Sequence, residues 1–448
     1  MFSVDAMIDR LDRAGFALSM ALLFVWSLPG TVALRGVLLV TTLAVLARRL
    51  VHPRPIWSMR TLGLPLGLFA ALTIWLLTQA FLISPETHWA LDELRGQWLP
   101  ALLALVLGMA LAMASNVAVA STGPGIVATA IVLIFGAQAI IAVGQSVWHW
   151  IAHGVLLRQL VPLTGGKLEM SFIINLLLAF LVVDLFHRVA WKSRLVRLPL
   201  GWVLAIAAAA LLSAYLAEAR NGIIGIVFLS FSAVSLFILA QYRQLGFFRT
   251  IGGVLAIIVT VGAFATASYR ADKRWLTFAE TAAIAWDIDK YKTWRDGNLW
   301  NRPVLPGGGL VEPSAYFRIA YIHTGLRLIE LAPLGQGYGR NAFSHALRQQ
   351  FPEVKSGHAH SGWIDLGVGG GIPAMLLWAA FVGSLMWRGL REFFGSNNPH
   401  GLLLFLLSTG YAGRMVLDSV NKDHMLQIFL FLAGLLLILT LPPSPKKS

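Results

Sequence analysis

The chain has no cysteine and few charged residues. Disulfides, thiolate metal sites and a cysteine nucleophile are therefore excluded. Charged side chains make up 12% of the 448 residues, about half the share that soluble domains carry. By contrast, 57% of the residues are hydrophobic and the mean hydropathy is +0.72. Near-continuous apolar runs lie along the whole chain, which argues against one large soluble core and predicts an all-α polytopic membrane protein.

Acidic residues are also scarce. The chain has 21 Asp and Glu against 35 Lys and Arg, which gives a formal net charge of +14 at pH 7. In a membrane protein such an excess concentrates in cytoplasmic loops, and it can also bind anionic lipids or phosphate groups. We therefore expect the lipid bilayer and an anionic ligand as partners, and no nucleic acid. No Walker loop or Gly-x-Ser-x-Gly motif is present, and we expect neither a metal nor a cofactor.

Twelve apolar runs have about the 17–25 residues that a membrane-spanning helix needs. The predicted spans are residues 15–30, 31–47, 62–83, 98–119, 124–147, 170–187, 199–217, 221–241, 250–268, 361–386, 398–417 and 424–441. They divide the chain into an N-terminal transmembrane bundle (1–268), one large polar segment between the ninth and tenth spans (269–360) and C-terminal transmembrane helices (361–448). Residues 316–331 of the polar segment predict an amphipathic helix.

The distribution of Lys and Arg predicts the orientation of these spans. Loops after even-numbered spans are basic, for example with Arg48 and Arg49 after the second span and Arg188 after the sixth. Loops after odd-numbered spans, such as 84–97, are less basic, and acidic residues partly balance their charge. Because basic loops face the cytoplasm, both termini are predicted to be cytoplasmic and the polar segment to lie on the outer side.

Two histidines, His358 and His360, stand where the polar segment enters a span. Histidine is the side chain best suited to accept a proton near neutral pH. Alternatives are an amphipathic histidine at the membrane interface, or a metal shared by the pair, although no third ligand is evident. If the protein is an enzyme, we expect its chemistry at this place.

Arg220 lies at the predicted outer end of a span, and Arg318 lies on the amphipathic run. The planar guanidinium of arginine can donate two parallel hydrogen bonds to a phosphate and keeps its charge when it is desolvated. The alternatives are an arginine that snorkels at a span end and a solvated basic face. Because outward-facing loops are not usually enriched in positive charge, some of this charge is expected to meet an anion.

Four short motifs follow one another in a familiar order. They are Arg220-Asn221-Gly222, Arg318-Ile319-Ala320-Tyr321, Ala332-Pro333-Leu334-Gly335-Gln336-Gly337-Tyr338-Gly339 and His358-Ala359-His360-Ser361. This pattern resembles the O-antigen ligase and O-antigen polymerase superfamily over roughly residues 205–390. The glycine-rich turn followed by histidine is the most specific part of the resemblance.

The resemblance implies a GT-C-like glycosyltransferase in the inner membrane of a Gram-negative bacterium, with a periplasmic active site. Such a ligase transfers O-antigen glycan from undecaprenyl diphosphate to a sugar hydroxyl of lipid A–core, with inversion and without a metal. It implies His360 as the general base and arginines as ligands of the diphosphate. These arginines are Arg220 and Arg318, with Arg270 and Arg158 as further candidates. The supporting residues would be His358, Asn221 and Tyr338.

Other functions stay open at this level. An O-antigen polymerase or a protein O-oligosaccharyltransferase would use the same donor and differ in the acceptor, for which the sequence shows no code. A transporter or flippase for lipid-linked sugars belongs to a different class, in which internal repeats are common, and none is evident in the sequence. A non-catalytic length regulator or scaffold would not need a histidine beside several arginines.

Overall fold

The structure of the chain is a computed structural model that describes residues 4–51, 59–118, 125–159, 161–271, 277–296, 301–354 and 357–441. Within these ranges the chain is almost entirely helical. The described strands form one short antiparallel hairpin, β1 (Val304–Leu305) with β2 (Gly309–Leu310). The predicted all-α polytopic membrane fold is confirmed.

Each of the twelve predicted spans corresponds to a helix in the structure. These helices are α1 (Val4–Val25), α2 (Val32–Val51), α3 (Met59–Leu82), α5 (Leu99–Ala118), α6 (Gly125–His153), α7 (Lys167–Trp191), α8 (Leu200–Ala217), α9 (Arg220–Leu245), α10 (Phe247–Ala271), α15 (Gly362–Ser396), α16 (Pro399–Leu417) and α17 (Asp423–Leu439).

Eight helices within the described residues are long and apolar enough to cross a membrane, fewer than the twelve that the sequence predicts. Three of the other four helices differ for identifiable reasons. Helices α1 and α2 carry several charged side chains, including Asp12, Arg48 and Arg49, and α17 has only 17 residues. The chain is therefore a multi-pass membrane protein, and fewer helices than predicted are long and apolar enough to cross the membrane.

The predicted loop 84–97 is mostly helical. Helix α4 (Thr87–Glu93) continues through a π-helical turn, η1 (Leu94–Trp98), directly into α5. A π-turn accommodates an extra residue within a continuous helix. The sequence predicts a loop here because residues 92, 93 and 95 are charged. In the structure these residues lie on a helix that extends the span beyond its apolar part.

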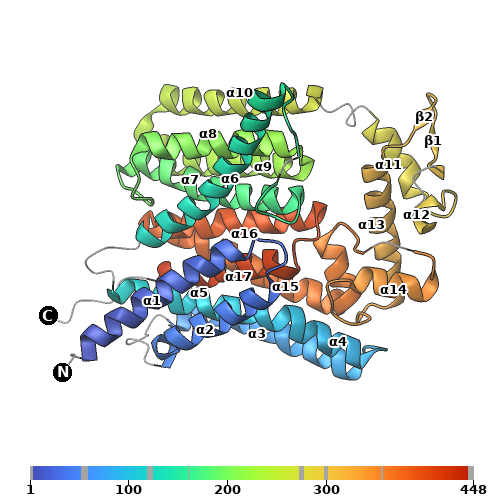
Figure 1. The fold of residues 1–448 in the computed structure, drawn as a ribbon, viewed down its shortest axis with the longest axis horizontal. Helices are drawn as coiled ribbons and strands as arrows, with labels where there is room; N and C mark the ends of the chain where they lie inside the picture. Colours follow the sequence, from blue (N-terminus) through green and yellow to red (C-terminus); the bar gives the residue numbers. More distant parts are fainter. Residues whose placement is uncertain are drawn as a thin grey trace.

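The polar segment packs at one end of the helical bundle, on the right in Figure 1, away from the end at which the chain starts and finishes. It contains α11 (Phe278–Trp286), α12 (Thr293–Asp296), α13 (Pro313–Leu331), α14 (Ala342–Gln350) and the hairpin. Trp294, Tyr316 and Phe343 are fully buried in a second hydrophobic core. The residues predicted to form an amphipathic helix lie in α13, which starts earlier, at Pro313, where the Glu312 side chain caps it.

Two glycine-rich stretches join the polar segment to the bundle. Helix α15 is broken at Gly371, whose φ is 76°. The backbone N–H of Ile372 donates to Pro333 O (2.8 Å), and that of Gly337 donates to Gly369 O (3.0 Å). A Cβ on Gly335 would lie 2.4 Å from Gly369 O, so only glycine permits this approach. The turn therefore replaces the helical hydrogen bonds that the kink breaks, and it holds the start of α15 against the polar segment.

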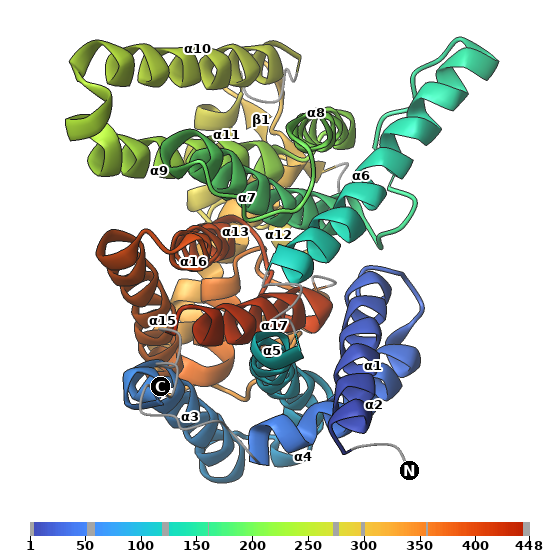
Figure 2. The ribbon, with the colours of Figure 1, turned by 90° about the vertical axis from the view of Figure 1, so that its left-hand side faces the viewer.

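Helix α16 lies in the centre of the bundle. It contacts α15, α17, α7 and α9, and Figure 2 shows it between the α7–α9 layer and the helices α15 and α17. Its C-terminal end points toward the polar segment, because Gly362 N at the start of α15 donates to Asp418 O (3.0 Å), directly after α16. The ends of α9, α13 and α16 and the start of α15 thus meet at one place.

Candidate active site

An open cavity with about 590 Å³ of empty space lies where the polar segment meets the membrane helices. It brings together Arg220 at the start of α9, Arg318 on α13 and His360 directly before α15. The lining residues are Arg220, Asn221, Ile224, Phe278, Ser314, Ala315, Arg318, Ile319, Ile322, His360, Val416 and Leu417. Two guanidinium groups and one imidazole, from three distant parts of the sequence, therefore surround one space.

Arg318 is oriented by a buried amide. Its Nη1 donates to Asn221 Oδ1 (3.0 Å), and Asn221 Nδ2 donates to Leu417 O (2.9 Å). Asn221 is 5% exposed, so this side chain ties α13, α9 and α16 together. Unlike a carboxylate, this amide partner carries no opposite charge. Arg318 therefore brings positive charge to the cavity wall.

Arg220 has a carboxylate partner. Its Nη2 lies 3.2 Å from Glu312 Oε1, and the two side chains are 12% and 7% exposed. The second oxygen of Glu312 accepts a hydrogen bond from Ala315 N (2.6 Å). Burial of this pair is compensated by its mutual attraction and its hydrogen bonds. Glu312 therefore links the first turn of α9 to the first turn of α13.

His360 adopts a left-handed backbone conformation with φ of 56°. Its Nδ1 is buried and has no hydrogen-bond partner among the described residues. Burial lowers the pKa of His360 to about 4, and the nearby Arg318 guanidinium adds to this effect. The imidazole is therefore neutral at pH 7 and able to accept a proton.

His358 lies beside His360 without lining the cavity. The two rings meet edge to face, with their centroids 4.2 Å apart. Burial holds the pKa of His358 well below its usual range, and His360 adds to this shift. Within the described residues no group of three or more His, Asp or Glu side chains is placed to hold a metal ion.

The remaining candidates lie elsewhere. Arg158 is exposed and pairs with Glu218 (3.0 Å). Arg270 is exposed in the last turn of α10. Tyr338 is buried in the glycine-rich turn, where its hydroxyl accepts a hydrogen bond from Gln97 Nε2 (2.8 Å). None of the three lines the cavity. All three were predicted to lie on the outer side, and residues on the same side need not be close together.

Sequence reasoning missed an Asp-x-Asp triplet in the polar segment, Asp287-Ile288-Asp289. Asp289 pairs with Arg327 (2.6 Å) on α13, and this pair lowers the pKa of Asp289. Neither aspartate lines the cavity. It also missed Glu312, whose only signal is its place directly before Pro313, where a helix cap is common.

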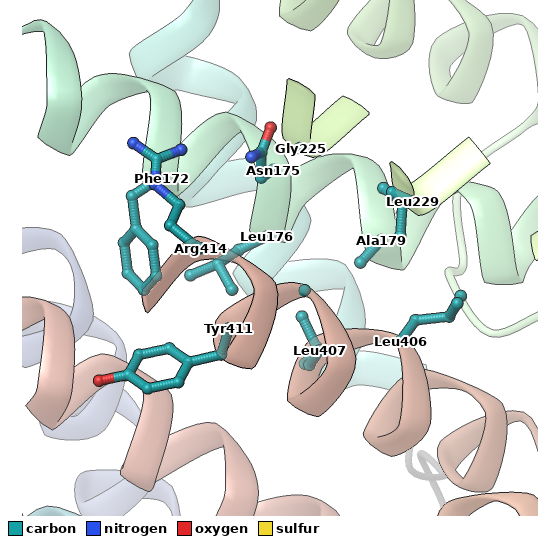
Figure 3. A pocket seen from close by; sticks show the side chains of 11 residues that line it. Phe172, Asn175, Leu176, Ala179, Gly225, Leu229, Leu406, Leu407, Tyr411 and Arg414 are labelled. Atoms are coloured by element: carbon teal, nitrogen blue, oxygen red, sulfur yellow. The ribbon is translucent and has the colours of Figure 1, made fainter. Parts of the chain in front are cut away.

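A second, smaller and partly open cavity, called the inner cavity below, lies among α7, α9 and α16 (Figure 3). Most of its lining is apolar, and Asn175 and Arg414 are among its few polar members. Arg414 donates to Leu168 O (2.9 Å) and pairs with Asp418 (3.1 Å). An arginine inside an apolar span is a sequence signal for a functional position, and Arg414 lies within the predicted span 398–417.

The inner cavity continues the first one along the same two helices. On α9, Asn221 of the first cavity and Gly225 of the inner cavity are one helical turn apart. On α16, Leu417 belongs to the first cavity, while Arg414 and Gly410 belong to the inner one and follow at helical spacing. A cavity at the bundle end, which holds Arg220, Arg318 and His360, and a cavity within the bundle thus share the α9–α16 contact.

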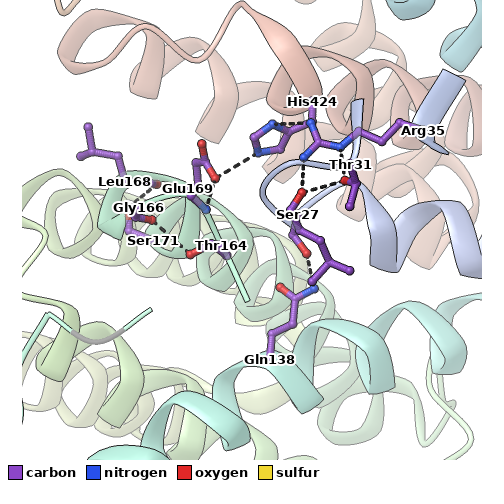
Figure 4. A network of polar contacts seen from close by, with 12 residues as sticks. Ser27, Thr31, Arg35, Gln138, Thr164, Gly166, Leu168, Glu169, Ser171 and His424 are labelled. Atoms are coloured by element: carbon purple, nitrogen blue, oxygen red, sulfur yellow. Dashed lines mark hydrogen bonds and ion pairs between the residues drawn. The ribbon is translucent and has the colours of Figure 1, made fainter. Parts of the chain in front are cut away.

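A separate polar network links α2, α7 and α17 (Figure 4). Arg35 Nη1 lies 3.4 Å from His424 Nδ1, and His424 Nε2 lies 3.5 Å from Glu169 Oε2. Arg35 also donates to Leu28 O (2.5 Å) and to Thr31 Oγ1 (3.0 Å). None of these residues lines either cavity. We interpret this network as a contact between helices.

Residues 204–379 match a family model described as O-antigen ligase. This match supports a place for the chain in the O-antigen ligase and polymerase superfamily. The matched region contains Arg220, Arg318, His360 and the glycine-rich turn. No curated protein matches the chain. Members of this superfamily are glycosyltransferase-like enzymes, so the function is of the O-antigen ligase or polymerase type.

Proposed function

We propose that the protein is an O-antigen ligase, which transfers O-antigen glycan from undecaprenyl diphosphate to a sugar hydroxyl of lipid A–core. The observation that carries this proposal is the meeting of Arg220, Arg318 and a neutral His360 around one cavity. Cationic groups beside a neutral base suit the transfer of a sugar from a diphosphate to a hydroxyl.

The proposed reaction forms one bond and breaks another. The acceptor hydroxyl oxygen attacks C1 of the first sugar, while a ring nitrogen of His360 takes the hydroxyl proton. The bond between C1 and the diphosphate oxygen breaks on the opposite face, so the configuration at C1 inverts. Undecaprenyl diphosphate leaves with the bonding electron pair, and the imidazolium then returns its proton to water.

The arginines act on the leaving group. Negative charge develops on the diphosphate oxygen as the bond to C1 breaks, and preoriented cations stabilise that charge more in the transition state than in the ground state. Arg318 donates to the neutral Asn221 (3.0 Å) and lines the cavity, where its guanidinium would bind the diphosphate. Arg220 forms an ion pair with Glu312, and a bound diphosphate would compete with that carboxylate for the Arg220 guanidinium.

The inner cavity suits the lipid part of the donor. A diphosphate at Arg220 and Arg318 would leave the polyprenyl chain beside the α9–α16 contact, where the apolar lining continues into the bundle. Burial of isoprenyl groups there would add binding free energy of about 25 cal/mol per Å² of apolar surface. The donor would then reach the site laterally between the helices.

We further propose that the site faces the periplasm from the inner membrane of a Gram-negative bacterium, with both termini cytoplasmic, on a GT-C-like fold. Two features support this orientation. Basic loops such as the one that follows Arg48 and Arg49 are placed by the positive-inside rule on the cytoplasmic side. The polar segment packs at the opposite end of the bundle from the chain ends (Figure 1).

An acceptor panel tests this function. Purified protein in proteoliposomes would receive lipid-linked glycan with lipid A–core, with a second molecule of glycan-lipid, or with a pilin-like protein. A ligase joins the glycan to lipid A–core. A polymerase, which the family match also covers, would extend the glycan-lipid instead, and product on the protein would indicate an O-oligosaccharyltransferase. Movement of the donor across the bilayer without bond formation would indicate a transporter.

A further inference from the structure

The backbone of His360 is held in an unfavourable conformation. Its φ of 56° lies in the left-handed region, where the Cβ of an L-residue crowds the backbone. The next residue, Ser361, returns to an extended conformation with φ of −145°. Such conformations persist where surrounding contacts impose them, and they gather at functional sites. The contacts around residues 358–362 therefore matter for where the His360 ring points.

One contact comes from the neighbouring histidine. The backbone N–H of His360 donates to Nδ1 of His358 (3.2 Å). A side-chain acceptor that binds the N–H two residues ahead has the arrangement of an Asx turn, which asparagine and aspartate commonly form. Because Nδ1 of His358 accepts this bond, the ring proton lies on Nε2. His358 is thus a hydrogen-bond acceptor for the backbone in this structure.

Further contacts come from a buried carboxylate and a hydroxyl. Asp365, in the first turn of α15, accepts the backbone N–H of Ala359 at Oδ1 (2.9 Å). Its Oδ2 accepts a hydrogen bond from Ser419 Oγ. Ser419 Oγ also lies 3.4 Å from His358 Nδ1. Asp365 and Ser419 are 5% and 2% exposed, so packing fixes both side chains.

The last turn of α16 and the loop after it hold the other end of this turn. Ser361 Oγ donates to Met415 O (3.1 Å), and Asn421 Nδ2 donates to Gly362 O (3.0 Å). Residues on both sides of His360 are thereby bound to elements that themselves pack in the core. Neither Asp365 nor Ser419 lines the cavity, so they can act on the reaction only through His360.

We propose that His358, Asp365 and Ser419 form a clamp that positions His360, in which His358 serves as a backbone hydrogen-bond acceptor and carries no proton in the reaction. The proposal rests on the proposed function, because it assigns these three side chains to the orientation of the base. All three are positioning residues. The clamp explains why a second histidine stands two residues before the base.

Substitutions of His358 separate the two roles of that residue. His358→Asn retains an acceptor that can bind the N–H two residues ahead, whereas His358→Ala removes it and neither variant can carry the proton of an imidazole. We expect His358→Asn to keep kcat within a few fold of wild type, and His358→Ala to lower kcat by about tenfold or more with little change in the donor KM. Equal loss in both variants would overturn the proposal.

Substitutions of Asp365 make the same comparison on the other contact. Asp365→Asn retains an oxygen that can accept the Ala359 N–H, and Asp365→Ala retains none. We expect the alanine variant to lose more kcat than the asparagine variant. The matched control is Asp184→Asn, a buried aspartate that caps the backbone N–H groups of Leu195 and Val196 away from the cavity, and it should leave kcat unchanged.

The pH profile provides a readout that a general loss of structure would not mimic. The acid limb of kcat/KM, assigned to His360, should keep its position in the active His358→Asn variant. A limb that moves or disappears would mean that His358 itself carries a proton, and would contradict the clamp.

A structural measurement separates the clamp from the enzymatic proposal. Electron cryomicroscopy of the full chain should show residue 360 with positive φ in the wild type and in His358→Asn, and with negative φ in His358→Ala. Positive φ in all three proteins would overturn the clamp whatever the activity. If the conformations follow this prediction and the wild type forms no glycosidic product, the clamp stands and the proposed ligase function fails.

Discussion

Two regions of the molecule bury the same kinds of side chain and differ in what surrounds them. Around the first cavity, Arg318 is held by the amide of Asn221 and His360 Nδ1 has no partner among the described residues. In the second region, His424 lies between Arg35 and Glu169, at 3.4 Å and 3.5 Å. The first group lines an open space of about 590 Å³, and the second lines neither cavity.

This difference shows which buried ionisable groups can meet a substrate. A guanidinium and an imidazole in a membrane protein are costly wherever they are buried, so their presence alone marks either function or helix packing. The Arg35 network compensates its charges internally. At the cavity, the Arg318 guanidinium and the His360 imidazole line an open space in which an anionic substrate could bind.

Loss of the base should have the largest effect. His360→Ala removes the group that takes the acceptor proton, and we expect kcat to fall by about 10²–10⁴-fold, the range that general-base catalysis provides. His424→Ala is the matched control from the second region and should keep kcat close to wild type. Turnover with purified lipid-linked glycan measures both. The comparison would break if the two variants lost activity equally.

Loss of a guanidinium at the cavity should rank next. Arg318→Ala and Arg220→Ala remove charge stabilisation of the leaving diphosphate, which we expect to cost about 10²–10³-fold in kcat. Arg318→Lys should rescue poorly, because an ammonium group lacks the planar fork that can bind Asn221 and a phosphate oxygen together. Full activity of Arg318→Lys would mean that only the charge matters.

The pH dependence should reflect the neutral His360. Burial, followed by Arg318 and Lys422, lowers its pKa to about 4, while Asp418 acts in the opposite direction. Since the base works unprotonated, kcat/KM should stay level as pH falls from 8 to about 5 and drop as pH approaches 4. An acid limb near pH 6.5 would show an exposed imidazole and contradict this environment. Initial rates across that pH range measure the profile.

Filling the inner cavity should affect the binding of the donor lipid. Gly410 lines this cavity, and a Cβ at this position would meet no heavy atom within 4 Å, so leucine would occupy the empty space. We expect Gly410→Leu to raise KM several-fold for a long polyprenyl donor and less for a short-chain donor, with kcat unchanged. Gly383→Leu is the control, since Gly383 also has open space and lines neither cavity. Equal effects of the two variants would argue against lipid binding there.

Disruption of the second region should affect stability and leave the chemistry almost unchanged. Arg35→Met leaves His424 without one of its partners, and an unsatisfied buried polar group costs about 1–3 kcal/mol. We expect a lower melting temperature in detergent and a kcat near that of the wild type. A large loss of kcat without a change in melting temperature would give this network a part in the reaction.

The sequence predicted the helices well and the contacts between them poorly. Apolar runs located all twelve predicted helices because hydropathy and length act locally, but charged residues hid α4 and η1, which lead into α5. The resemblance singled out Arg220, Arg318 and His360, which the structure places around one cavity. Spacing along the chain does not indicate that Glu312 pairs with Arg220 or that Asn221 binds Leu417 O. Both contacts depend on how α9, α13 and α16 pack.

The sequence also did not predict where the other candidate site residues lie. Arg158 and Arg270 were candidates because they stood on the predicted outer side, yet both are exposed away from the cavity. Tyr338 belongs to the glycine-rich turn, which hydrogen-bonds to the backbone on both sides of the kink at Gly371. A family motif thus contains residues that bind substrate and residues that fix the fold, and the sequence does not separate them.

Single turnover in proteoliposomes, with purified lipid-linked glycan and lipid A–core and without ATP or divalent cations, tests most directly whether His360 and the two arginines act on a sugar diphosphate. The wild type should form the glycosidic bond, and His360→Ala should bind the donor with unchanged affinity and form product about 10²–10⁴-fold more slowly. Product from His360→Ala at the wild-type rate, or donor transport without a new bond, would contradict the proposed mechanism.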